Sequence, residues 1–161
     1  MIDLGSKPEC AKTYTKGQAA VVGDQKTKLR LVVDGDFPLV CHTIDGCVFP
    51  AHDSPRKCAY LAETSAIEAY IELKTSLSAE PITKAIDQIE STIIALGRAG
   101  QSTRRRYFIV KGRSGLPQTE AQRALRLHKA VLNKHKAALR FPPSAQELAF
   151  TARGEIIGRG R

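Results

Sequence analysis

Three cysteines and a histidine lie close together in the first third of the chain, at a spacing suited to a metal ion. They are Cys41, Cys47, His52 and Cys58, in the pattern C-x5-C-x4-H-x5-C. Zinc prefers four thiolate or imidazole ligands at the corners of a tetrahedron. Gly46 lets the chain turn tightly beside the second cysteine. The pattern therefore predicts a structural zinc site, with His42 as an additional candidate ligand.

The ligand order Cys, Cys, His, Cys resembles that of the zinc knuckle of retroviral nucleocapsids, whose first pair of cysteines is closer than Cys41 and Cys47. The resemblance implies a structural metal and a module that contacts nucleic acid. Buried free thiols explain the same residues, because cysteine is often fully buried, and a disulfide is a third reading. Cys10 could also replace either histidine as a ligand, which spacing alone does not decide.

The same segment holds oxygen and nitrogen ligands for a divalent ion. Asp45, His52 and Asp53 could hold such an ion beside a bound phosphate, which is the arrangement that a metal-dependent nuclease needs. No established nuclease motif surrounds them. The phosphate-binding pattern G-x-x-x-x-G-K-[ST] occurs nowhere in the chain, which argues against an ATPase. We therefore expect a protein that is not an enzyme, with a small nuclease as a minor alternative.

Basic residues are concentrated in the second half of the chain. The 161 residues carry a net charge of +9, with 10 Lys and Arg against 13 Asp and Glu in residues 1–97, and 15 against 3 in residues 98–161. A weakly acidic front followed by a strongly basic back indicates a surface for a polyanion. Nucleic acid is the polyanion that we expect, either DNA or RNA.

One group of basic residues flanks an apolar strand predicted over residues 107–110. The group consists of Arg104, Arg105, Arg106, Lys111 and Arg113. Arginines at the ends of a strand suit phosphate, since guanidinium groups form paired hydrogen bonds with phosphate oxygens. Tyr107 or Phe108 could stack on a base, or both could belong to the core.

A second basic group lies on a helix predicted after Pro117. One face of that helix is apolar, from Ala121 to Leu139, and includes His128 and His135, which we expect to be core or boundary residues rather than metal ligands or an acid–base pair. The other face is basic over roughly 30 Å. It holds Arg126, Lys129, Asn133, Lys136 and Arg140, and Arg123 and Lys134 widen it. Such a face can lie in a DNA groove or along an RNA backbone.

The remaining elements form the scaffold. Alternating apolar residues and Asp-Gly turns predict strands over residues 18–22, 28–33, 37–42 and 46–49. Apolar residues at spacings of three and four predict helices over residues 59–77 and 82–96, folded back as a helical hairpin that belongs to the core or to a dimer seam. A short helix over 145–152 and a flexible tail rich in Arg and Gly, 153–161, complete the chain.

These elements predict an α+β fold in three consecutive segments. Residues 1–60 form a small antiparallel sheet with the cysteine cluster, residues 61–98 form the helical hairpin, and residues 99–161 form a basic strand, a long helix and a short helix. No apolar run is long enough to span a membrane, and the N-terminus lacks the pattern of a signal peptide. We therefore expect a cytoplasmic protein that does not bind membranes.

The function that fits these features is that of a non-enzymatic nucleic-acid-binding protein. A regulator or accessory factor of a bacterium, a phage or a mobile element would have this compact size and uneven charge. The alternative is a small interaction or inhibitor protein that docks its basic surface on an acidic host protein. Both hypotheses use the same residues, and both allow a homodimer.

Overall fold

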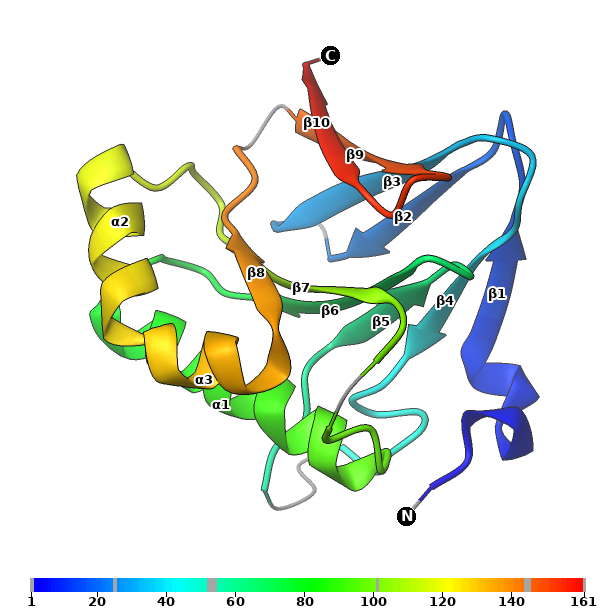
Figure 1. Ribbon diagram of the computed structural model, residues 1–161, viewed down its shortest axis with the longest axis horizontal. Coiled ribbons are helices and arrows are strands. Elements are labelled where there is room, and N and C mark those ends of the chain that lie inside the picture. The colour runs from blue at the N-terminus through cyan, green and yellow to red at the C-terminus, as the bar shows by residue number, and fades with distance from the viewer. Residues whose placement is uncertain (1, 25, 52–54, 101, 144–145, 161) are drawn as a thin grey trace.

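Three layers make up the computed structural model, which describes residues 2–24, 26–51, 55–100, 102–143 and 146–160. A layer of helices covers one face of a six-stranded sheet, and a four-stranded sheet covers the other face (Figure 1). The α+β class predicted from the sequence is confirmed. No helix of the described residues is long and apolar enough to cross a membrane.

The six-stranded sheet, sheet A, is mixed. Its strands in spatial order are β1 (Ala11–Tyr14), β4 (Leu39–Thr43), β5 (Tyr60–Glu63), β6 (Ile67–Leu73), β7 (Arg105–Lys111) and β8 (Ala137–Arg140). The strands from β1 to β6 pair antiparallel, whereas β6, β7 and β8 pair parallel. Parallel neighbours need long crossover connections, which are usually helical. The helices therefore lie between β6 and β8 in the sequence.

The four-stranded sheet, sheet B, pairs strands from the N-terminal part of the chain with strands from the C-terminal part. Its strands in spatial order are β10 (Ile156–Gly160), β9 (Gln146–Thr151), β3 (Lys28–Asp34) and β2 (Ala19–Gly23). Strands β3 and β9 pair parallel, from Arg30 opposite Glu147 to Asp34 opposite Thr151. The first and last parts of the chain thus share one sheet.

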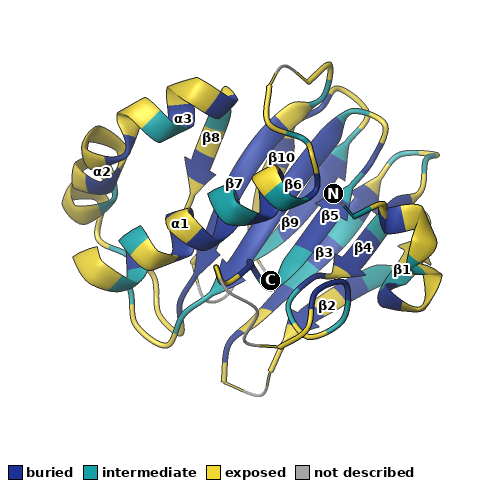
Figure 2. Ribbon diagram, turned by 90° about the horizontal axis from the view of Figure 1, so that it is seen from below, coloured by how far each residue is buried: buried dark blue, intermediate teal, exposed yellow. Residues whose placement is uncertain are grey.

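Three α-helices and two short 3-10 turns complete the structure. They are η1 (Leu4–Ser6), η2 (Pro8–Cys10), α1 (Ala79–Ala95), α2 (Gln118–Leu127) and α3 (Lys129–His135). Helix α1 connects β6 to β7, and α2 and α3 connect β7 to β8, all on the same face of sheet A (Figure 2). Residues Ile82, Ile86 and Ile89 of α1 are buried against that face.

Two apolar cores separate the three layers. One core lies between the helices and sheet A, where Tyr70 and Phe108 pack edge to face with ring centroids 6.4 Å apart. The other core lies between the two sheets, where Leu31 and Phe150 of sheet B pack with residues of sheet A such as Ile109. Because β6 and β7 contribute to both cores, these two strands are buried on both faces.

The helix predicted over residues 59–77 is wrong, and two antiparallel strands, β5 and β6, take its place. The physical reason is the burial of β6 on both faces, which removes the alternation of apolar and polar residues that marks a half-exposed strand. A turn at Thr64, whose N–H donates to the carbonyl of Ile67 over 2.9 Å, joins the two strands. The second helix of the predicted hairpin is confirmed as α1.

Two predictions near the C-terminus are also wrong. The short helix predicted over 145–152 is strand β9, and the tail predicted to be flexible contributes strand β10. In β9 and β10, Leu148, Phe150 and Ile156 point into the core between the sheets. Residues 145 and 161 of those predicted segments lie outside the described residues.

The strands predicted over 18–22, 28–33, 37–42 and 107–110 correspond to β2, β3, β4 and β7. The strand predicted over 46–49 is instead a turn. Gly46 has a positive φ of 84°, and an isolated bridge connects Asp45 with Phe49. Glycine adopts such a φ without the steric cost that a side chain brings.

Candidate nucleic-acid interface

The basic face predicted after Pro117 exists, but two helices and a strand build it. Helix α2 ends at Leu127, His128 has the non-helical angles φ −105° and ψ 16°, and α3 follows. Lys136 then ends α3 with a positive φ of 51°, and the chain continues as the edge strand β8. The prediction of one continuous helix is therefore wrong, because the chain bends at His128 and reverses at Lys136.

Six predicted binding residues lie exposed on these elements, and we call them the helix face. They are Arg123, Arg126, Lys129, Asn133, Lys136 and Arg140. Within the described part of the chain, none of the five cations among them makes an ion pair. Residues 113–143 carry seven Lys and Arg and a single acidic residue, Glu120. Within the described residues, the structure thus leaves five cations exposed and unpaired: Arg123, Arg126, Lys129 and Lys136 on or directly after the helices, and Arg140 at the end of β8. Lys134, which was expected to widen the basic face, pairs with Glu90 of α1 at 3.4 Å.

Two buried histidines hold the helix face on α1. The Nε2 atom of His128 lies 3.3 Å from the hydroxyl of Thr83, and Nε2 of His135 lies 2.6 Å from the carboxylate of Glu90. Burial alone would raise the pKa of Glu90, but the hydrogen bond with His135 and the charge of Lys134 lower it overall. Burial lowers the pKa of His128. The expectation that both histidines are core or boundary residues is confirmed.

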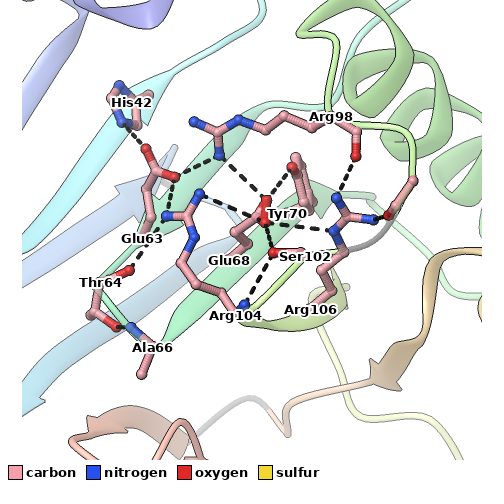
Figure 3. Close-up of polar contacts among 11 residues, drawn as sticks. His42, Glu63, Thr64, Ala66, Glu68, Tyr70, Arg98, Ser102, Arg104 and Arg106 are labelled. Carbon is pink, nitrogen blue, oxygen red and sulfur yellow. Dashed lines mark hydrogen bonds and ion pairs between the residues drawn. The ribbon is translucent and has the colours of Figure 1, made fainter.

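Arg104, directly before β7, and Arg106, within it, occupy a different environment, shown in Figure 3. The Nη1 atom of Arg104 donates to Glu63 over 2.9 Å, and Nε of Arg106 lies 3.6 Å from Glu68. Arg98 contacts both carboxylates, at 2.6 Å from Glu63 and 3.3 Å from Glu68. These five side chains form a network that we call the arginine–glutamate cluster. It lies where α1 ends above the first residues of β7.

Further donors complete the arginine–glutamate cluster. Glu68 is 1% exposed and accepts hydrogen bonds from the hydroxyls of Tyr70 and Ser102, over 2.9 and 2.8 Å. A ring nitrogen of His42, Nε2, lies 2.8 Å from Glu63. Arg106 also donates to the carbonyls of Gly100 and Arg98. The guanidinium groups of Arg104 and Arg106 are thus occupied within the protein.

The electrostatics of the arginine–glutamate cluster favour charged carboxylates. Burial raises the pKa of Glu63, but the hydrogen bonds from His42 and Arg98 and the charges of Arg98 and Arg104 outweigh it and lower that pKa to about 2. For Glu68, burial is likewise outweighed by the hydroxyl and arginine contacts, and the pKa is lowered. Burial is the largest effect on Tyr70 and, with the charge of Glu68, raises its pKa.

Acid should therefore destabilise the protein through Glu63. Its pKa in the folded state, about 2, is below the ordinary value, so its stabilising contribution is complete above about pH 5 and is lost as the pH falls toward 2. We expect the free energy of unfolding to fall by on the order of 2 kcal/mol over that range. Denaturant unfolding at several pH values measures this. The Glu63→Gln variant should show a shallower pH dependence, and an unchanged dependence would contradict the assignment.

The remaining residues predicted around β7 are divided between the interior and the surface. Lys111 is buried, donates to the carbonyl of Gly112 over 2.7 Å, and has a pKa lowered by burial. Tyr107 and Phe108 are buried in the two cores, where neither ring can stack on a base. Arg105 and Arg113 are exposed. Of this group, only these two present a free guanidinium at the surface.

The four cysteines lie at separate places in the fold, apart from one bonded pair, and do not surround a common metal position. Cys47 forms a disulfide with Cys10, with Cα atoms 5.7 Å apart. Cys41 and Cys58 are free and lie in different cores, and burial raises the pKa of each thiol to about 12. His52 lies outside the described residues.

A disulfide sulfur is not the thiolate that zinc binds. Zinc binding by the predicted set therefore requires reduction of the Cys10–Cys47 bond and movement of Cys41 and Cys58 to one side of sheet A. The described residues contain no group of three or more His, Cys, Asp or Glu placed to hold a metal ion. Zinc at this position stays a prediction.

The nuclease hypothesis depends on residues that the structure places only in part. Asp45 lies 3.4 Å from a guanidinium nitrogen of Arg56, whereas His52 and Asp53 lie outside the described residues.

The acidic partners of Arg104 and Arg106 could not have been found from the sequence pattern. Glu63 and Glu68 precede these arginines by about 40 residues and fall in the segment that was predicted as a helix. Compared with protein-family models, with the curated proteins and with the solved structures, the chain shows no match.

Proposed function

We propose that this chain is a non-enzymatic nucleic-acid-binding protein that contacts the phosphate backbone through the helix face. The observation that carries the proposal is the set of five exposed cations on α2, α3 and β8 that make no ion pair within the described residues. Unpaired cations gathered on one surface bind phosphates by releasing the counterions around the nucleic acid. A regulator or accessory factor is the role that we propose.

On other parts of the surface, cations are paired with carboxylates. On the outer face of sheet B, Arg30 pairs with Glu147 at 3.0 Å and Arg159 pairs with Asp34 at 2.6 Å. On α1, Lys84 pairs with Glu80 at 3.1 Å. In each of these three pairs a nearby carboxylate neutralises the cation. Residues 113–143 contain only one acidic residue, Glu120, and Glu90 of α1 pairs with Lys134 and His135. The five cations of the helix face keep their charge unpaired among the described residues, so their field extends into solvent and attracts a polyanion.

Equilibrium binding with three probes tests the proposal. Random-sequence DNA duplex, RNA duplex and poly-glutamate are labelled and titrated with the protein at low salt. We expect at least one nucleic acid to bind more tightly than poly-glutamate, because phosphates form paired hydrogen bonds with arginine. Poly-glutamate binding as tightly as either nucleic acid would favour an acidic protein partner. No binding of any nucleic acid would remove the proposal.

The second candidate function, docking on an acidic protein, is favoured by two exposed leucines. Leu125 and Leu127 of α2 are 41% and 65% exposed, beside the cations Arg123 and Arg126. Leu127 also lines a hollow between α1 and α2, together with Ile82 and Ala124. Apolar side chains next to charges are common at protein interfaces.

Substituting Leu127 separates the two candidates. The Leu127→Gln variant leaves every cation of the helix face in place, so its affinity for nucleic acid should stay within about twofold of that of the original protein. Fluorescence anisotropy with the same duplex measures this, and Leu125→Gln serves as the matched variant on the other side of α2. A loss of about tenfold or more in the Leu127 variant would show that phosphate contacts alone do not explain the interface.

A further inference from the structure

Three arginines lie on elements that contact or carry Tyr107, on the face of sheet A that is turned away from the helices. Arg105 lies two residues before Tyr107 on β7, Arg140 ends β8, and Arg153 lies in the turn between β9 and β10. We call these three residues the arginine cluster. Their positions in the sequence are far apart, so only the fold brings them together.

Buried Tyr107 fixes the arrangement. Its hydroxyl donates to the carbonyl of Gly154 over 3.2 Å and accepts from the N–H of Ile156 over 3.3 Å, which fixes the turn that carries Arg153. The guanidinium carbon of Arg140 lies 5.5 Å from the centre of the Tyr107 ring.

Close packing at Gly154 brings the turn against Arg105. A Cβ atom at Gly154 would lie 3.6 Å from Cδ of Arg105, and the backbone there has a φ of +82°. The turn at Gly154 therefore lies beside the Arg105 side chain, at a backbone conformation that suits glycine.

The charges of the arginine cluster are not neutralised. All three arginines are exposed, and none makes an ion pair within the part of the chain that the structure describes. This contrasts with Arg104 and Arg106, on either side of Arg105, whose guanidinium groups contact Glu63 and Glu68. The nearest carboxylate along the chain in the β9–β10 turn is Glu155, which is also exposed.

Strand β8 lies between the arginine cluster and the helix face. It is the outermost strand of sheet A, and Lys136 of the helix face directly precedes it. Arg140 at its other end belongs to both groups. A polyanion that follows the open edge of β8 therefore meets cations on both sides of the sheet.

We propose that the arginine cluster is a second phosphate-binding surface, and that one nucleic acid crosses the edge of β8 and contacts both the cluster and the helix face. This inference rests on the proposed function, because it assigns further contacts to the same ligand. It assigns a binding role to Arg153, and it groups Arg105 and Arg140 on the side of the sheet opposite the helices.

A double variant, Arg105→Gln with Arg153→Gln, tests the proposal against a control of equal charge. The control is Lys26→Gln with Lys28→Gln, since both lysines are exposed at the β2–β3 turn. The probes are random-sequence duplexes of about 20 and about 6 base pairs, roughly 70 and 20 Å long. We expect the cluster variant to bind the long duplex about tenfold more weakly than the control, with a salt slope lower by about 2.

The length comparison tests the continuous contact across β8. On the short duplex the difference between cluster variant and control should shrink, because that probe offers fewer phosphates and contacts fewer of the cations at once. Equal losses of affinity on both probes would show that one nucleic acid does not cross the edge of β8. A cluster variant that binds the long duplex as tightly as the control would show that the arginine cluster is not a phosphate-binding surface. In both cases the proposed function stands. Failure of the original protein to bind either probe would instead remove the proposed function. Thermal unfolding should be the same for both variants, because all four side chains are exposed.

Discussion

Reversing the charge of Lys129 and Lys136 to glutamate should weaken nucleic-acid binding by about 100-fold or more at low salt. Both lysines are exposed, and they stand at the two ends of α3. Each reversal removes a phosphate contact and adds a repulsive charge. Stability should change by only a few tenths of a kcal/mol, because exposed charges contribute little to folding. Fluorescence anisotropy and denaturant unfolding measure the two effects separately.

A glycine substitution at Lys136 separates the effect of the charge from that of the fold. Its φ of 51° is one that glycine adopts without strain, so Lys136→Gly should raise the free energy of unfolding by about 0.5–1 kcal/mol. The same variant should bind more weakly, because it lacks one cation. A protein that is more stable and yet binds less tightly separates the role of the charge from that of the fold. Undiminished binding in both Lys136 variants would show that the helix face does not hold the phosphate backbone.

Removing Glu68 should have the largest effect on stability. Glu68 is 1% exposed and lies within 3.3 to 3.7 Å of Arg98, Arg104 and Arg106. The Glu68→Ala variant leaves the buried Arg106 without its carboxylate, and breaking a buried ion pair in this way costs about 3–5 kcal/mol. Denaturant unfolding at neutral pH measures the loss.

Glu80 offers the control for that measurement. It pairs with Lys84 on the exposed side of α1, and Glu80→Ala should cost less than about 1 kcal/mol. If the Glu68 variant were no less stable than the Glu80 variant, the arginine–glutamate cluster would not be a structural network. Arg104 and Arg106 would then be free to serve as phosphate ligands, as the sequence alone suggested.

The parts of the fold with a regular pattern and one exposed face were predictable. Helix α1 was identified because Ile82, Ile86, Ile89 and Ile93 recur at helical spacing after Pro81. Strand β3 was identified because its buried residues alternate with more exposed ones. In both cases the pattern of apolar residues reflects a single buried face, which periodicity can detect.

The elements buried on both faces were not predictable in this way. Strand β6 has six buried residues in a row, and its Tyr70 and Leu73 also fit a helical stripe that starts at Ala59. Strands β9 and β10 were missed because sheet B joins distant parts of the chain, and no local pattern indicates that β3 pairs with β9.

The positive charges of the candidate site could be predicted from the sequence, whereas the carboxylates that pair with some of them could not. The exposed cations of α2 and α3 follow from helical spacing, and the structure leaves them exposed. Whether an arginine is free depends on contacts across the fold. Arg105 is free and Arg106 is not, because successive residues of a strand point to opposite faces of the sheet. Arg106 therefore faces Glu68, and Arg105 faces the turn at Gly154.

The salt dependence of binding tests the central claim most directly. The affinity for a random-sequence duplex is measured at several salt concentrations between about 20 and 300 mM, and the logarithm of the association constant is plotted against that of the salt concentration. Five cations on the helix face that each neutralise one phosphate predict a slope of about −4 to −5. A slope near zero, or no binding at the lowest salt, would contradict the account.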